Sequence, residues 1–231
     1  MPISILDIEG TVCPISFVKE TLFPYFLDKV PEYLDTVTFP LDPSQSALAK
    51  TLSGFPSEHT QSKDTLLRHL RHLVENDVKE VNLKAFQGTV WKEGYEKGDI
   101  MAPVYQDAID FIRSPENKIY IYSSGSIPAQ ILLFQHVNVE GKSTDLTSFI
   151  SGYFDISTAG YKQERKSYEK IVKEISAPAS ELTFYSDVTK EVEAATEAGV
   201  KAVIVARPGN APLSAGDKDK FKVIESFSTV N

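Results

Sequence analysis

Short apolar runs that stop abruptly at polar residues recur along the chain. They are rich in β-branched and aromatic residues, and their near-continuous apolar character is typical of strands that helices cover on both faces. The runs are ISIL before Asp7, KIYIY before Ser123, LTFY before Ser186 and Asp187, and KAVIVA before Arg207. Helical patterns separate them, which favours an α/β protein with an open parallel sheet.

Helical periodicity fills the intervals between these runs. One helix is expected to have Pro103 in its first turn and to bury one face formed by Val104, Ala108, Phe111 and Ile112. Further helices are expected over residues 128–137, 165–176 and 189–199, the last of them ended by Gly199.

The interval between the first two strands is far longer than the roughly dozen residues that a crossover requires. Ser16 is a candidate N-cap for a helix within it, and Leu66, Leu70, Leu73 and Val74 are spaced for one helix face. Residues 35–62 are rich in Pro, Ser and Thr without a sustained period, so we expect a surface connection there.

The sequence therefore predicts a Rossmann-like, doubly wound parallel sheet with an inserted all-helical cap domain. The α/β core would comprise residues 1–15 and 101–231, and the helical cap residues 16–100. A single domain with one insert suits a chain of 231 residues.

Composition limits the possible partners. A net charge of −8 provides no basic field for nucleic acid, and no apolar run approaches the roughly 20 residues of a membrane span. The only cysteine, Cys13, cannot form an internal disulfide, and the beginning MPISILD lacks the basic region of a secretory signal. We expect a cytoplasmic monomer, and the sequence leaves open whether the protein also enters the nucleus.

Candidate chemistry gathers where the strands end, because ligands of open parallel sheets bind outside the carboxyl ends of the strands. Asp7, Ser123 and Asp187 should therefore converge. Asp7 and Glu9 follow the first strand at i and i+2, and two adjacent carboxylates must share a cation or a proton. The alternative for this pair is a strand end with solvated acids.

Asp187 adds a third carboxylate, and Glu191 follows one helical turn later. Oxygen ligands without His or Cys suit magnesium. The alternative is that both acids stabilise the N-terminus of the next helix, a role compatible with the first.

Two further groups could bind an anion. Ser123 and Ser124 begin a hydroxyl-rich turn before a helix, which suits a phosphate or serves only as a cap. Lys162 could neutralise phosphate oxygens, but it lies in the charged run KQERK, where a lysine taken alone is expected to be solvated.

Taken together, ILDIEGT, IYIYSSGS, Lys162 and FYSDVTKE, in this order and with a helical insert after the first, resemble the haloacid dehalogenase superfamily of phosphatases. Within it, the chain is similar to the enolase-phosphatases (acireductone synthases) of methionine salvage, because TVCPISFVKETLFPYF, IDFI, GYFDI and ARPGNAP extend the resemblance over nearly the whole chain. Glu9 replaces the second aspartate of the usual Asp-x-Asp-Gly-Thr, a feature of this branch. Val188 follows Asp187 where a second acid is common, so the role of Glu191 stays open.

The resemblance implies that Asp7 is the nucleophile and forms an aspartyl-phosphate. One Mg²⁺ per chain would be held by Asp7, Asp187 and either the carboxylate or the carbonyl of Glu9. Glu9 would also act as general acid and base, and it is a candidate for the base of enolisation.

The same resemblance implies that Ser123 and Ser124 donate hydrogen bonds to the substrate and that Lys162 fixes the phosphate. The implied substrate is a small phosphate ester, 2,3-diketo-5-methylthiopentyl-1-phosphate, which is enolised and then dephosphorylated beneath the cap. One alternative is another phosphatase of this fold that acts on a sugar phosphate or a nucleotide. A second is a catalytically silent binding module, against which the intact acidic and basic motifs argue.

Overall fold

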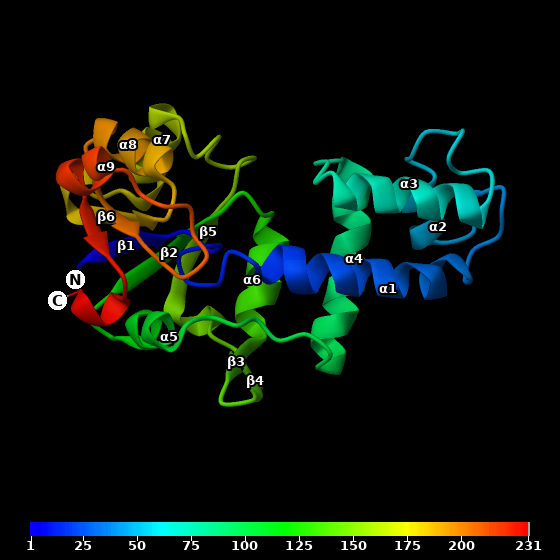
Figure 1. The fold of residues 1–231 in the computed structure, drawn as a ribbon, viewed down its shortest axis with the longest axis horizontal. Helices are drawn as coiled ribbons and strands as arrows, with labels where there is room; N and C mark the ends of the chain where they lie inside the picture. The colour runs from blue at the N-terminus through cyan, green and yellow to red at the C-terminus, as the bar shows by residue number, and fades with distance from the viewer. Residues whose placement is uncertain (231) are drawn as a thin grey trace. The chain divides into compact units, whose positions relative to one another are not determined.

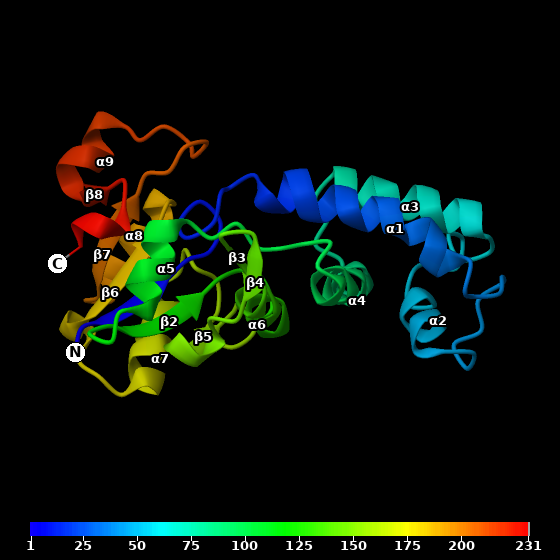
Figure 2. The same ribbon diagram turned by 90° about the horizontal axis from the view of Figure 1, so that it is seen from below.

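The computed structural model describes residues 1–230, and the chain divides into two compact units. One unit comprises Met1–Phe17 and Met101–Asn231, and the other is the continuous segment Val18–Ile100. Figures 1 and 2 show the first unit as a sheet flanked by helices and the second as helices joined by loops. The predicted insertion covers residues 16–100, and its role as a cap stays a prediction.

Within residues 1–230, the core unit contains a six-stranded sheet whose neighbouring strands are all parallel. The order of the strands in the sheet is β5-β2-β1-β6-β7-β8. The chain therefore adds β2 and β5 on one side of β1, and then crosses to the other side to add β6, β7 and β8. This order confirms the predicted Rossmann-like, doubly wound fold. The strands are β1 Ile3–Leu6, β2 Lys118–Tyr122, β5 Ile150–Phe154, β6 Leu182–Ser186, β7 Lys201–Val205 and β8 Lys222–Ile224.

Helices cover both faces of the sheet, so its inner strands are apolar on both sides. Phe184 of β6 packs against Tyr168 on one face, and Tyr185 packs against Phe111 on the other. Figure 1 shows α7 and α8 on the first side and α5 on the second. These helices are α5 Gln106–Arg113, α7 Arg165–Ile175 and α8 Thr189–Glu197.

Smaller elements complete the core unit. They are α6 Ile127–Gln135, the antiparallel hairpin of β3 Val137–Val139 and β4 Lys142–Thr144, the short helix α9 Ala215–Lys220, and the 3-10 turns η2 Thr147–Phe149, η3 Ala179–Glu181 and η4 Phe227–Thr229. None of the helices in the described part of the chain combines the length and the apolar character that a bilayer crossing requires.

The prediction that Pro103 lies in the first turn of a helix is wrong. The helix α5 begins at Gln106, and Tyr105 before it is extended. The N–H of Tyr105 donates a hydrogen bond to the carbonyl of Val12 at 2.9 Å. This contact with a distant segment satisfies the amide of Tyr105, and the N–H of Val104 donates to the Ala102 carbonyl at 2.9 Å, so Pro103 lies in a tight turn before the helix. Val104 is buried from outside the helix.

Arg207, which follows β7, links distant parts of the core. Its Nη2 donates to Oδ2 of Asp107 at 2.9 Å, and its Nε donates to the carbonyl of Thr11 at 3.0 Å. The same carboxylate oxygen accepts from Ser226 Oγ at 2.8 Å and from the N–H of Phe227 at 2.7 Å. Burial opposes ionisation of Asp107, but these hydrogen bonds outweigh it and hold the pKa of the carboxyl below its ordinary value.

Asp107→Asn is therefore expected to lower the free energy of unfolding at pH 7 by about 2 kcal/mol, because it leaves the Arg207 guanidinium without its counter-charge. A carboxyl with a depressed folded pKa stabilises the fold above its unfolded pKa of about 4 and loses this effect as the pH falls through the folded pKa. Urea unfolding of wild type and variant at pH 7 and at lower pH should show the difference shrinking on acidification. The exposed Asp110→Asn on the same helix is the matched control, and a pH-independent difference for Asp107→Asn would contradict the assignment.

The second unit is built from helices around an aromatic and aliphatic core. The helix α1 packs against both α3 and α4, and Figure 2 views α4 nearly end-on while α1 runs across the picture. Phe26 of α1 and Phe86 of α4 meet edge to face, with their ring centroids 5.2 Å apart. The predicted apolar face of Leu66, Leu70, Leu73 and Val74 is confirmed as buried. The helices are α1 Phe23–Leu34, preceded by a π-helical segment Val18–Leu22, α2 Ala47–Leu52, α3 Lys63–Glu75 and α4 Val81–Lys97.

The prediction of a surface connection over residues 35–62 is wrong in part, because the helix α2 lies within it. Ser46 caps this helix, since its Oγ accepts from the N–H of Ala49 at 3.0 Å. Leu52 is fully buried in the core of the helical unit. A helix of six residues is too short to show a sustained period in the sequence, and tertiary packing stabilises it instead.

Candidate active site

Asp7 lies directly after β1, at the carboxyl edge of the sheet. Its amide donates to the carbonyl of Tyr185 at 3.0 Å, and its Oδ1 accepts from the N–H of Ile8 at 2.8 Å. The amides from Thr11 to Cys13 then all donate to the Ile8 carbonyl, at 2.9 to 3.2 Å, and close a tight turn. The carboxylate is thus held at the end of a buried strand, with its side chain 7% exposed.

Gly10 lets this turn approach the carboxylate of Asp187. Its φ of +71° is a conformation that favours glycine, and a Cβ at this position would lie 2.4 Å from Oδ2 of Asp187. Asn210 Nδ2 donates to the Gly10 carbonyl at 2.9 Å and holds the turn in place. The first and last motifs therefore meet only because residue 10 lacks a side chain.

Gly10→Ala is expected to lower kcat by about 100-fold, because the clash displaces Asp187 or the turn after Asp7 by a distance that catalysis does not tolerate. The strained φ should also lower the free energy of unfolding by about 1–2 kcal/mol. Phosphate release at saturating Mg²⁺ and thermal unfolding measure the two effects. Gly88→Ala in α4, where a Cβ would meet nothing within 4 Å, is the control and should leave kcat unchanged. An unaltered kcat in Gly10→Ala would contradict the need for this close approach.

Lys162 is buried between two carboxylates. Its Nζ lies 2.6 Å from Oδ1 of Asp7 and 2.8 Å from Oε2 of Glu191, and its side chain is 8% exposed. Burial alone would lower the pKa of this ammonium, but the charges of Asp7 and Glu191 outweigh burial and raise it. The residues that follow it in KQERK are exposed, as expected for a charged run. The expectation of a solvated Lys162, taken from the run alone, is wrong.

Ser186 joins Glu191 to this cluster. Its Oγ donates to Oε2 of Glu191 at 2.8 Å, lies 3.3 Å from Oδ2 of Asp7 and accepts from the N–H of Val188 at 3.1 Å. Burial and then the charge of Asp7 raise the pKa of Glu191, in spite of its contact with Lys162. Glu191 therefore contacts Lys162 and Ser186 directly.

Asp187 is half-buried near Asp7. Burial and then the charge of Asp7 raise the pKa of Asp187 to about 7. Such a pair fits a divalent cation. Among residues 1–230, no three His, Cys, Asp or Glu side chains form a group that could hold a metal ion. Asp7 and Asp187 therefore supply two carboxylates that suit Mg²⁺, and binding of the metal by Glu9 stays a prediction.

Glu9 is half-buried and pairs with Cys13 in a short parallel bridge. Burial and then the negative charge of Glu9 raise the pKa of the Cys13 thiol. Cys13 is therefore an inert, protonated thiol, and the roles of Glu9 in metal binding and proton transfer stay predictions.

Ser123 and Ser124 follow β2 at the same edge of the sheet. Ser123 is buried and its Oγ accepts from the N–H of Gly125 at 3.3 Å, whereas Ser124 is exposed. This turn is linked to the end of the neighbouring strand β5, because Oδ2 of Asp155 accepts a hydrogen bond from the N–H of Ile127 at 3.1 Å. The predicted contact of both serines with substrate stays a prediction.

Ser186, Arg207 and Asn210 were not among the predicted site residues. Arg207 and Asn210 donate to the carbonyls of Thr11 and Gly10 and so hold the turn that follows Asp7. All three residues stand at or shortly after the carboxyl end of a strand. That position was the signal that could have indicated them.

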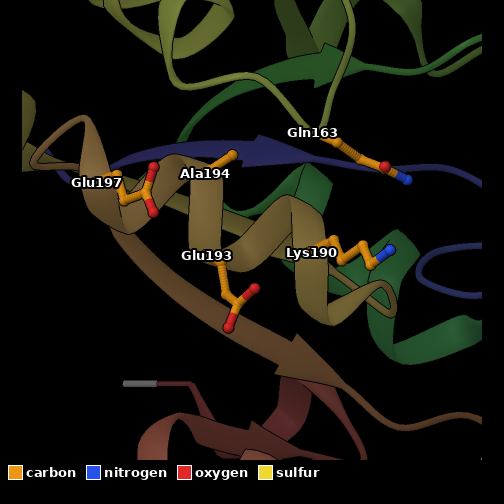
Figure 3. A pocket seen from close by; sticks show the side chains of 5 residues that line it. All are labelled: Gln163, Lys190, Glu193, Ala194 and Glu197. Carbon is orange, nitrogen blue, oxygen red and sulfur yellow. The ribbon is translucent and has the colours of Figure 1, made fainter.

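A shallow hollow of about 230 Å³ lies along α8 (Figure 3). Figure 3 shows the side chains of Lys190, Glu193 and Glu197 pointing in different directions, so the wall offers no convergent polar groups. None of the predicted site residues is among its lining residues, which are Gln163, Lys190, Glu193, Ala194 and Glu197. The candidate chemistry lies at the sheet edge and not in this hollow.

Comparison with known proteins identifies the family. Enolase-phosphatase E1 of Clavispora lusitaniae is 56% identical over 228 residues, covering 99% of this chain and 99% of that protein. Enolase-phosphatase E1 of Candida albicans is 49% identical over 250 residues, covering 98% of this chain and 94% of that protein. The chain belongs to the enolase-phosphatase E1 family. Membership in this family confirms the resemblance indicated by the motifs, and the alternative of another phosphatase of this fold is not favoured.

Solved structures have the same fold as this enolase-phosphatase E1 family member. The UTR4 protein of Saccharomyces cerevisiae is 47% identical, with a TM-score of 0.86 and 99% of each chain covered. The HAD-hydrolase YfnB of Bacillus subtilis, bound to magnesium, is 14% identical, with a TM-score of 0.58 over 98% of this chain and 95% of that chain, and shares the fold alone. No family model matches the chain.

Proposed function

We propose that this chain converts 2,3-diketo-5-methylthiopentyl-1-phosphate to acireductone and phosphate, by enolisation followed by dephosphorylation. Membership in the enolase-phosphatase E1 family supports this substrate. The observation that carries the proposal is the 2.6 Å contact between Lys162 Nζ and Asp7 Oδ1 at the carboxyl edge of the sheet. It puts a carboxylate nucleophile beside a cation that can bind a phosphoryl oxygen.

In the first chemical step, an oxygen of Asp7 attacks phosphorus and the bond between phosphorus and the ester oxygen breaks. The departing enol oxygen takes a proton from Glu9, and Asp7 carries the phosphoryl group as an aspartyl-phosphate. In the second step, Glu9 takes a proton from water, whose oxygen attacks the same phosphorus. Phosphate leaves, and the Asp7 carboxylate is restored.

The remaining residues bind and orient the phosphate. Lys162 offsets negative charge on the phosphoryl oxygens as a point charge, and Glu191 keeps the ammonium in place when Asp7 becomes phosphorylated. Ser123 and Ser124 donate hydrogen bonds to the substrate.

Mg²⁺ would be held by Asp7, Asp187 and the Glu9 carbonyl. When bound, it neutralises phosphoryl oxygens and polarises the enolising carbonyl. In this proposal the helical unit Val18–Ile100 acts as the cap domain. The expected monomeric state and cytosolic location stay predictions.

The test is a comparison of purified protein on the diketo ester, p-nitrophenyl phosphate and glucose 6-phosphate, with Mg²⁺ and with EDTA. We expect kcat/KM for the diketo ester to exceed the values for the other two esters by at least about 100-fold, because an enzyme specific for this substrate recognises the whole ester. EDTA should abolish turnover and added Mg²⁺ should restore it. Equal rates on all three esters would refute the substrate assignment, and the outcome with glucose 6-phosphate reports directly on the sugar-phosphate alternative.

A further inference from the structure

Three successive backbone carbonyls, those of Gly160, Tyr161 and Lys162, each accept a hydrogen bond from a different side-chain hydroxyl. Tyr122 OH donates to the Gly160 carbonyl at 2.7 Å. Ser167 Oγ donates to the Tyr161 carbonyl at 2.7 Å, and the hydroxyl of Tyr168 donates to the Lys162 carbonyl, also at 2.7 Å. Water can satisfy the carbonyls of a surface loop. Hydrogen bonds from three side chains to three consecutive carbonyls are therefore more than a surface turn requires.

The three hydroxyls come from rigid, buried parts of the core. Tyr122 ends β2, whereas Ser167 and Tyr168 lie in the first turn of α7. The rings of Tyr122 and Tyr168 are fully buried and meet edge to face with their centroids 5.7 Å apart. Burial raises the pKa of Tyr122 to about 12 and also raises the pKa of Tyr168, so both phenols remain donors at neutral pH.

The backbone conformation of residues 160–164 leaves room for these hydrogen bonds. Gly160 has a φ of +116°, and a Cβ there would lie 2.6 Å from Ser167 Oγ, so a side chain at residue 160 would displace one of the three donors. The N–H of Glu164 donates to the Tyr161 carbonyl at 3.1 Å and closes a turn around Lys162.

We propose that the hydroxyls of Tyr122, Ser167 and Tyr168 are positioning groups, which fix the peptides of residues 160–162 and thereby hold the Lys162 ammonium between Asp7 and Glu191. This inference rests on the proposed function of Lys162 in phosphate binding. A lysine side chain is a flexible four-carbon stem, so the place of its ammonium depends on where the backbone starts. The two carboxylates fix the far end of the stem, and the three hydroxyls fix the near end.

The experiment compares Tyr168→Phe, Tyr122→Phe and the control Tyr153→Phe. Each variant removes one phenolic hydroxyl, but the hydroxyl of Tyr153 is buried without a hydrogen-bond partner. We expect Tyr168→Phe and Tyr122→Phe to lower kcat by about tenfold or more with KM changed less than about threefold, because a small displacement of a catalytic group acts on the transition state. Tyr153→Phe should retain the kcat and KM of wild type.

Three further measurements separate positioning from loss of folded protein and from failure of the proposed substrate. Rates are normalised to the folded fraction from circular dichroism, and each variant is assayed on the diketo ester and on p-nitrophenyl phosphate. A crystal structure of Tyr168→Phe should show Lys162 Nζ displaced from its place beside Asp7. If kcat falls on p-nitrophenyl phosphate while wild type shows no preference for the diketo ester, the substrate assignment fails and the positioning role stands.

The positioning role is overturned if both variants, per folded molecule, retain the kcat of the Tyr153→Phe control. It is equally overturned if Lys162 Nζ keeps its place beside Asp7 in the Tyr168→Phe crystal. Ser167→Ala provides a second variant in case a tyrosine variant fails to fold, and the same loss of kcat is expected for it.

Discussion

Asp7→Asn is expected to abolish phosphate release, with kcat lowered by at least about 10⁴-fold, the scale of loss when a covalent nucleophile is removed. The amide cannot displace the enol oxygen from phosphorus, so no phosphoryl group is transferred to the protein. It also removes one of the two carboxylates proposed for Mg²⁺. Rapid-quench detection of a phosphorylated protein, present in wild type and missing in the variant, measures the step itself.

The same variant should fold normally. Asn keeps the shape of Asp, can still accept from the N–H of Ile8, and leaves Lys162 paired with Glu191. Burial and then the charge of Asp7 raise the pKa values of Asp187 and Glu191, so removal of that charge relieves repulsion between buried carboxylates. Thermal unfolding should therefore show a stability equal to or above that of wild type.

The exposed Asp219→Asn, on α9, carries the same change of charge outside the site and should match wild type in both assays. Turnover of Asp7→Asn above about one hundredth of the wild-type rate would remove Asp7 from the role of nucleophile.

Lys162→Met should combine a loss of activity with a loss of stability. In metal-free buffer, removal of the ammonium leaves two buried carboxylates, Asp7 and Glu191, without their cation, and we expect the free energy of unfolding to fall by about 3 kcal/mol. In the presence of Mg²⁺, kcat should fall by at least about 100-fold, because the charge that stabilises the phosphoryl oxygens is gone. Urea unfolding and phosphate release measure the two effects.

A matched control and a second substitution separate these effects. Lys166→Met, at an exposed position of α7, should change neither quantity appreciably. Glu191→Gln added to Lys162→Met removes one of the unpaired charges, so the double variant should regain part of the lost stability and none of the activity. A double variant less stable than Lys162→Met would show that the two side chains are not coupled as an ion pair.

The positions of the sheet's inner strands follow from local patterns. The runs ISIL, KIYIY and LTFY coincide with β1, β2 and β6 because strands covered on both faces are apolar throughout and end where polar residues begin. The prediction failed where distant contacts override local preference. Pro103 lies ahead of α5, in a segment held by a hydrogen bond from Tyr105 to Val12. The six-residue helix α2 was missed because it is too short to show a period.

For the site, the sequence by itself determined that Asp7, Ser123 and Asp187 stand at the ends of parallel strands, and its motifs indicated the family. Only the tertiary structure decided that Lys162 is buried between Asp7 and Glu191, that Ser186 donates to Glu191, and that hydroxyls from β2 and α7 hold the lysine's own backbone. The physical reason is the range of the interactions. Strand and turn preferences are set by neighbouring residues, whereas the burial and partners of a charge depend on which strands the sheet brings side by side.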